Sequence, residues 1–332
     1  MNKKIIVLAM ALLLAAGLLS GCGKKEGSSD EGSKKLKVVT TIFPEYDWTK
    51  QVLGDKAEDA DVTMLLDNGV DLHSYQPSAK DIKKISSCDV FIYVGGESDE
   101  WVKDALKEAT NKDMVVINLM DTLGSSIKEE EVKEGMQAEE EEDDHEGDGD
   151  EEEPEHDEHV WLSLKNANVC VDAIAAGLSD VDPKNKDAYE ANASDYKDKL
   201  IKLDGEYENT IKGAANKTLI FGDRFPFRYM VEDYGLDYYA AFVGCSAESE
   251  ASFKTVKFLA NKIDELGLRH IMTIEKNDHK IAKTIIKNTN AKDIDILTLD
   301  SMQSTTADDV KDGATYYDIM AKNLKVIKKA LN

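Results

Sequence analysis

The sequence predicts an α/β protein with two lobes, each with a mostly parallel sheet flanked by helices. Short runs of β-branched and apolar residues alternate with helical patterns, which favours parallel sheets covered on both faces. This alternation occurs twice, before and after a long polar stretch with a helical pattern. The 332 residues are enough for two lobes of ordinary size.

The first half contains four predicted strands. The β-branched run at 36–43 predicts a buried strand, and Pro44 opens a helix that ends before Gly54. The same reasoning predicts strands at 60–66, 89–94 and 114–119, and helices at 78–86, 101–109 and 163–178. We therefore assign an N-terminal lobe to residues 36–182.

Residues 183–214 predict one long helix, since this stretch has no proline after Pro183. At about 1.5 Å per residue, thirty residues span roughly 45 Å, enough for a stiff rod between two lobes. Its charge-rich face fits the solvated surface of a single domain equally well. The alternation resumes in a C-terminal lobe, 215–332, with strands at 217–221, 238–243, 270–274 and 294–299, and helices at 227–234, 252–266, 280–287 and 308–331.

The first residues read as an export signal. Two lysines precede an apolar stretch that is short for a membrane span, which indicates a signal peptide at 1–21. The sequence Leu-Leu-Ser-Gly-Cys that ends at Cys22 resembles a bacterial lipobox, which implies a lipid on Cys22. Residues 22–35 are polar and predict a flexible tether. We expect an extracytoplasmic protein anchored to the cell membrane.

Three cysteines remain after Cys22, so a full set of disulfides is excluded. Cys88 and Cys170 fit buried small apolar residues better than a zinc cluster, and no CxxC motif occurs.

Charge is concentrated in one insert. Residues 129–158 carry 19 acidic residues and one lysine, so this stretch accounts for −18 of the chain's net charge of −25. We predict a disordered acidic loop at 122–158 that contains His145 and His156. The loop either captures metal weakly or only keeps the chain soluble. The overall charge argues against nucleic acid as a partner and against a basic membrane-docking face.

Imidazoles and carboxylates lie near the predicted strand ends. Ligands of open parallel sheets bind beyond the carboxyl ends of strands, and imidazole together with carboxylate suits zinc or manganese. The candidates are His73, His159, Asp223, Arg224, Glu275 and Asp300. For Asp300, a helix N-cap is the competing interpretation.

Two motifs together resemble the metal-binding subunit of bacterial ABC importers for zinc or manganese. They are the His-Ser-Tyr-x-Pro-Ser sequence at 73–78 and the histidine before Val-Trp-Leu at 159–162. The resemblance covers nearly the whole chain. It implies two lobes joined by one long helix, a metal site in the cleft between them, and His73, His159 and Asp300 as ligands. The acidic loop with His145 and His156 is similar to that of zinc-binding members.

One position departs from this family pattern. The family has a third ligand ten residues before the Tyr of a Tyr-Gly-Leu turn. Here that Tyr is Tyr234, and counting back ten residues gives Arg224, which does not ligate metal. Either Asp223 reaches in, or another group such as Glu275 or a water completes the site, or the first lobe mainly holds the metal. Arg224 could also pair with Asp300 or Glu275 in the empty state.

The resemblance implies a monomeric receptor without catalysis. It would bind zinc, or alternatively manganese, and deliver it to an ABC permease driven by an ATPase. Rival interpretations are a lipid-anchored metal-dependent hydrolase and a surface adhesin. Against the hydrolase interpretation, the sequence contains no HExxH, GxSxG or P-loop motif.

Overall fold

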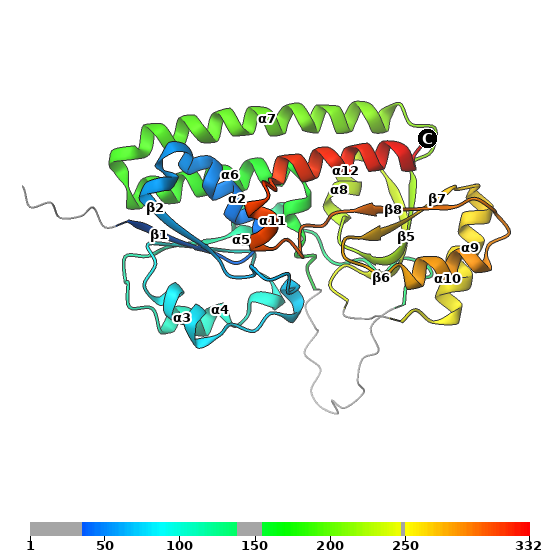
Figure 1. The fold of residues 1–332 in the computed structure, drawn as a ribbon, viewed down its shortest axis with the longest axis horizontal. Helices are drawn as coiled ribbons and strands as arrows, with labels where there is room; N and C mark the ends of the chain where they lie inside the picture. The colour runs from blue at the N-terminus through cyan, green and yellow to red at the C-terminus, as the bar shows by residue number, and fades with distance from the viewer. Residues whose placement is uncertain (1–34, 138–154, 247–249) are drawn as a thin grey trace, which may run out of the picture. The chain divides into compact units, whose positions relative to one another are not determined.

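Two parallel four-stranded sheets form the framework of the chain in a computed structural model (Figure 1). The structure describes residues 35–137, 155–246 and 250–332, and Leu36–Asn332 forms one compact unit. The first sheet has the order β2-β1-β3-β4 and the second the order β6-β5-β7-β8. The strands are β1 Leu36–Thr40, β2 Ala60–Met64, β3 Val90–Tyr93, β4 Val115–Asn118, β5 Thr218–Phe225, β6 Asp237–Val243, β7 His270–Ile274 and β8 Asp295–Leu299. The predicted fold class is confirmed.

Both sheets use the same topology, in which the first strand of each half is central and the second strand lies at one edge. Every pairing is parallel, as in the register of Val38 with Val62 on one side and Val90 on the other. The carboxyl ends of the strands in each sheet therefore lie along one edge, and the loops that follow them gather there. The site described below is built from such loops.

Helices cover both faces of each sheet (Figure 1). Helices α2 and α6 pack on one face of the first sheet, opposite α3 and α4, while α9 and α10 lie on the second sheet opposite α8 and α12. The helices are α2 Phe43–Leu53, α3 Ala79–Ser86, α4 Val102–Lys107, α5 Leu119–Leu123, α6 Leu164–Val181, α7 Lys186–Lys212, α8 Arg228–Tyr234, α9 Phe253–Leu266, α10 Lys280–Asn288, α11 Ala307–Lys311 and α12 Tyr316–Ala330. None of these helices combines the length and apolar character that a membrane crossing requires.

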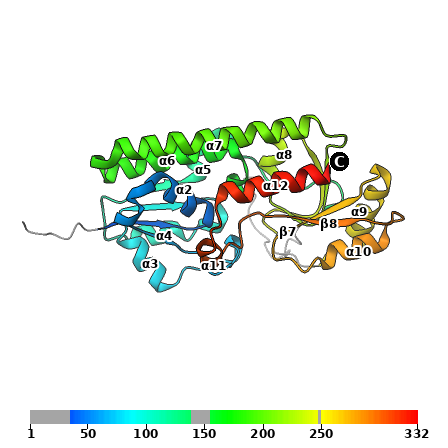
Figure 2. The ribbon, with the colours of Figure 1, turned by 45° about the horizontal axis from the view of Figure 1, so that its top comes forward.

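The long helix α7 contacts elements of both halves, packing on α2 and α6 and also on α8 and α12 (Figure 2). The predicted long helix is thus present. The predicted single last helix is wrong, because the chain breaks into α11 and α12 around Gly313, whose φ is +92°. Helix α12 runs back beside α7 and also contacts α2. Asp47 on α2 accepts the Tyr316 N–H at 3.1 Å, so the last helix joins the core of the first lobe.

The prediction of disorder across 122–158 is wrong at both ends of that range. Residues 127–137 run beside 155–157, with Glu129 bridged to His156, and then reach β6, where the Gln137 N–H donates to the Ala241 carbonyl at 2.9 Å. Charged side chains of this stretch find partners far along the chain: Lys133 pairs with Asp237 at 2.5 Å. Local repulsion is therefore offset by tertiary contacts. Residues 138–154, with His145, lie outside the described residues.

The predicted signal peptide 1–21, Cys22 and the tether up to residue 34 also lie outside the described residues. Cys88 and Cys170 are buried free thiols, as predicted.

Candidate metal centre

Two histidines from separate loops meet at the centre of the site. His73 lies in the short 3-10 turn Leu72–Ser74 after β2, and His159 immediately precedes the 3-10 turn Val160–Leu162. Their Nε2 atoms are 3.2 Å apart. His159 is fully buried, and the His73 side chain is only 9% exposed. The structure thus brings together two residues that are 86 positions apart.

Each imidazole is held from behind at its Nδ1 atom. His159 Nδ1 lies 2.9 Å from an oxygen of Asp157, which also accepts the His159 backbone N–H. His73 Nδ1 lies 2.8 Å from the Ser98 hydroxyl and 3.3 Å from Glu158 Oε2. A carboxylate at Nδ1 favours the tautomer protonated there, which leaves the Nε2 lone pair available. In that tautomer both lone pairs are directed into the same space.

A thiol is the third group at this point. Among the described residues, His73, His159 and Cys245 form a group whose nitrogen and sulfur atoms all lie within 4.8 Å of one another. Cys245 follows β6 and is half-buried and free. Burial, followed by the charge of Glu130, raises the pKa of its thiol.

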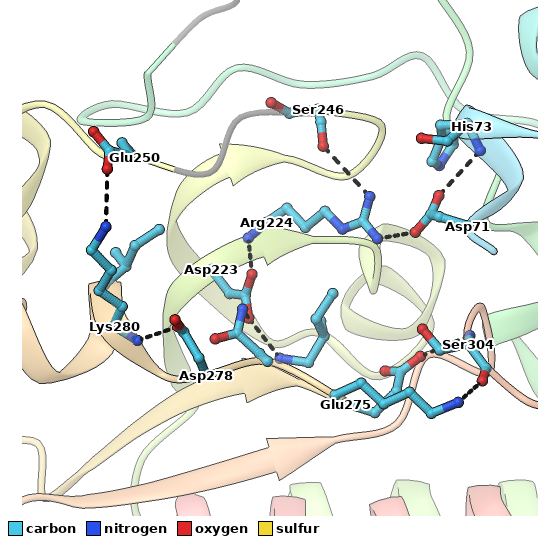
Figure 3. A pocket seen from close by; sticks show the side chains of 15 residues that line it. Asp71, His73, Asp223, Arg224, Ser246, Glu250, Glu275, Asp278, Lys280 and Ser304 are labelled. Atoms are coloured by element: carbon cyan, nitrogen blue, oxygen red, sulfur yellow. Dashed lines mark hydrogen bonds and ion pairs between the residues drawn. The ribbon is translucent and has the colours of Figure 1, made fainter. Parts of the chain in front are cut away.

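Arg224, which the family resemblance places at the position of a third ligand, turns to the first lobe and pairs with Asp71 (Figure 3). A guanidinium nitrogen also lies 3.5 Å from the Ser246 carbonyl. The expectation that Arg224 pairs with Asp300 or Glu275 is therefore wrong, since the Asp71 carboxylate from the loop after β2 reaches it instead. Burial raises the pKa of Asp71, but the charge and hydrogen bond of Arg224 outweigh it, so this pKa is lowered.

Gln303 connects this ion pair to the histidines. In the amide orientation that satisfies its neighbours, Gln303 donates to both Asp71 oxygens, at 3.2 and 3.0 Å. Its own oxygen then accepts a hydrogen bond from His159 Nε2 at 3.0 Å, a contact that requires a proton on this nitrogen. The segment after β8 thereby contributes a neutral oxygen beside the imidazole pair.

The carboxylates Glu275 and Asp223 of the second lobe accept hydrogen bonds from neighbouring strand ends of the same lobe. Glu275 accepts the Ser301 N–H at 2.7 Å and its hydroxyl at 2.8 Å. Asp223 accepts the Ile274 N–H at 3.0 Å and an Asn277 amide N–H at 2.7 Å. Both line a cavity of about 580 Å³ together with Asp71, His73 and Arg224 (Figure 3).

Asp300 caps no helix, because its Oδ1 accepts the Met302 N–H at 2.8 Å in a turn after β8. It does not belong to the three-residue group among the residues that the structure describes. Burial, followed by the charge of Glu275, raises the pKa of Asp300 to about 6, and burial likewise raises the pKa of Asp223 to about 6. Metal ligation by either residue stays a prediction.

The other histidines that the structure describes lie elsewhere. His156 is exposed and pairs with Glu129 at the base of the acidic segment. His279 Nδ1 lies 3.1 Å from the Thr273 hydroxyl, and His270 begins β7.

Comparison with known proteins identifies the family. A model of the periplasmic zinc-uptake complex component A matches residues 38–330. The chain belongs to this family. It is 35% identical over 327 residues to the high-affinity zinc uptake system protein ZnuA of Bacillus subtilis, an alignment covering 98% of this chain and 97% of that protein.

Other members of the zinc-uptake component A family extend beyond this chain. The zinc-binding protein AdcA of Streptococcus pyogenes is 32% identical over 300 residues, which cover 89% of this chain and 56% of AdcA. The chain thus spans only about half the length of that relative. The Zn(II)-bound ZnuA-like domain of Streptococcus pneumoniae AdcA superposes with a TM-score of 0.68 at 31% identity, over 90% of this chain and 99% of that domain.

Several residues of this site could not be predicted from the sequence. Asp157 and Glu158 directly precede His159, and their position within the acidic stretch hid their role. Asp71, Cys245 and Gln303 reach the site only through tertiary structure. The odd cysteine count was the one sequence signal that could have singled out Cys245.

Proposed function

We propose that this chain is an extracytoplasmic zinc receptor that binds one ion between its lobes and delivers it to an ABC permease. The observation that carries the proposal is the pair of imidazoles with facing Nε2 atoms, each backed at Nδ1 by a carboxylate. This carboxylate–histidine arrangement is the one that orients imidazoles for zinc.

The spacing of the pair fits the ion. Zinc binds imidazole nitrogen at about 2.0–2.1 Å, so two nitrogens of a tetrahedral site are about 3.3 Å apart. The Nε2 atoms of His73 and His159 are 3.2 Å apart. Without a cation, two facing lone pairs repel each other unless one nitrogen carries a proton. A zinc ion at this point would therefore remove an unfavourable contact while barely moving either ring.

The donor set favours zinc over manganese. Manganese prefers more oxygen ligands and a higher coordination number, whereas two imidazoles suit a four-coordinate zinc site. The names of the relatives agree with this choice. We propose His73 and His159 as ligands, with Asp300, Asp223 and Glu275 as ligands only in a rearranged state. His145 and His156 are proposed to capture metal weakly.

The remaining features of the proposal concern place and partners. A lipid on Cys22 would hold the receptor, as a monomer, near the permease and its ATPase. A lipoprotein name among the relatives supports this arrangement. The proposal includes no catalytic step, and the hydrolase and adhesin interpretations have no supporting observation in the site.

Calorimetric titration of the purified, metal-stripped protein tests the proposal. We expect one tightly bound zinc ion and much weaker manganese binding. His73→Ala and His159→Ala should each abolish tight binding, because each removes one of the two imidazoles. His270→Ala is the matched control, since it removes an imidazole from the start of β7. Tight zinc binding that survives both site substitutions would refute the proposal.

A further inference from the structure

The turn after β6 places the thiol of Cys245 beside the two imidazoles. The three groups come from three separate segments: the loop after β2, the residues before the Val160–Leu162 turn, and residues 244–246. Their ligand atoms lie within 4.8 Å of one another, within reach of a single ion after small side-chain rotations. Residues of both halves thus supply donors to one point.

The backbone of this turn is fixed against His159. A Cβ atom at Gly244 would lie 3.0 Å from His159 Cε1 and 2.9 Å from the Phe225 carbonyl oxygen. Any side chain at position 244 would therefore push the turn away from the imidazole. From the other side, Glu130 accepts the Cys245 N–H at 3.0 Å. Glu130 belongs to the same segment that pairs with the residues preceding His159, because its own N–H donates to the Glu155 carbonyl at 2.8 Å.

Arg224 cannot act as a metal ligand, so the site has room for the Cys245 thiol as a third donor. Its guanidinium is engaged by Asp71 and the Ser246 carbonyl, so the usual third ligand position carries a cation that cannot coordinate metal. The second-lobe carboxylates Glu275 and Asp223 already accept hydrogen bonds from neighbouring strand ends of the same lobe. Cys245 is the second-lobe residue that joins both imidazoles in the group described above.

We propose that Cys245 is the third metal ligand, bound as a thiolate in place of the ligand lost at Arg224. This inference rests on the proposed function, and it states which class of metal ion the same site would select. On binding, the thiol proton passes to water and a zinc–sulfur bond forms. Because thiolate is a soft ligand that manganese disfavours, two nitrogens and one sulfur select for zinc and other thiophilic ions.

X-ray absorption spectroscopy of the zinc-loaded full chain tests this ligand directly. We expect a zinc–sulfur distance of about 2.3 Å in the natural protein, in addition to nitrogen or oxygen at about 2.0 Å. Cys245→Ser should lose the sulfur signal while both imidazoles stay bound. Cys170→Ala is the matched control, because it removes a thiol from α6 and should leave the spectrum unchanged.

Titrations of Cys245→Ser give the second readout. Zinc affinity should fall by at least about tenfold, while manganese affinity should stay within about twofold, so that the preference for zinc narrows. One tightly bound zinc ion with only nitrogen and oxygen neighbours, and unchanged zinc affinity in Cys245→Ser, would overturn the thiolate ligand alone. Failure of the natural protein to bind zinc would overturn the proposed receptor function as well.

Discussion

The two lobes share one sheet topology but treat their polar side chains differently at the cleft. In the first lobe, the carboxylates of Asp157 and Glu158 stand behind imidazoles and leave the Nε2 atoms directed to the centre. In the second lobe, Asp223 and Glu275 accept hydrogen bonds from backbone N–H groups at neighbouring strand ends of the same lobe. The first lobe therefore presents oriented imidazole nitrogens, whereas the carboxylates of the second lobe hold its strand ends in place.

This difference teaches that the type of residue at a strand end does not decide its role. Carboxylates occur beyond the strands of both lobes, yet their partners set the chemistry. A carboxylate that faces an imidazole nitrogen orients a ligand, while one that faces backbone N–H groups fixes a loop. Four perturbations probe how far the contrast holds.

The largest effect is expected from comparing one residue of each lobe. His159→Ala should weaken zinc binding by more than about 100-fold, since losing a ligand exceeds the cost of losing an outer partner. Asp300→Asn keeps an oxygen for the Met302 N–H and should change affinity by less than about tenfold. Competition with a zinc chelator measures both. An equally severe loss in Asp300→Asn would mean that the second lobe supplies a charged ligand after rearrangement.

Asp157→Asn should rank second. The amide can no longer stabilise the Nδ1–H of His159 with a full charge, so zinc affinity should fall by about 10–100-fold. Asp223→Asn, the matched change in the second lobe, should have a smaller effect on affinity. The same chelator competition compares the two variants, and equal losses would erase the proposed contrast between the lobes.

The stability of the first lobe should depend on Asp99. Burial, followed among the raising effects by the charge of Glu158, raises the pKa of Asp99 to about 7. Because the folded state holds this proton more tightly than the unfolded state, its contribution to stability grows as pH falls below about 7. Asp99→Asn should remove that contribution. The difference in unfolding free energy between natural protein and variant should then change by up to about 1.4 kcal/mol per pH unit between roughly pH 4 and 7.

Urea denaturation of both proteins across this pH range measures the difference. Asp223→Asn serves as the second-lobe counterpart, with its transition near pH 6 because the pKa of Asp223 is raised to about 6. A pH-independent difference for Asp99→Asn would show that this carboxyl is already neutral or solvated throughout the range.

The smallest effect should follow from breaking the ion pair between the lobes. Arg224→Gln removes the charge that pairs with Asp71 and should speed zinc release a few-fold, with a smaller change at high salt. Stopped-flow release into a chelator measures this rate. Arg228→Gln is the control, since Arg228 pairs with Glu131 and Glu232 instead. If the zinc release rate of Arg224→Gln equals that of the natural protein at all salt concentrations, the ion pair between Arg224 and Asp71 does not slow release.

Most of the fold follows from local sequence patterns. The β-branched run at 36–43 and its counterparts predict the strands, because buried parallel strands need continuous apolar residues. Residues 127–137 contradict the same reasoning, because their charged side chains pair with distant partners: Glu131 with Arg228, and Lys133 with Asp237. The break at Gly313 is equally hidden, since the helical pattern continues on either side of it.

The site is predictable to a similar depth. The histidine motifs identify His73 and His159, but nothing in the local sequence shows that their Nε2 atoms meet. Cys245 and Asp71 enter through the arrangement of loops from different strands, and such proximity has no period or spacing to detect. Arg224 lines the cavity beside His73, but the sequence predicts the wrong partner for its guanidinium.

Helix α12 makes the order of folding unusual. Tyr316 packs edge-on against Trp48 at 5.0 Å between ring centroids and donates its hydroxyl to the Trp161 carbonyl at 2.7 Å. Contacts closed over such sequence separations carry a large loop-closure cost and slow folding. During synthesis, the core of the first lobe can therefore be completed only after α12 has been made. Loss of the final helix would damage the half of the protein that was made first.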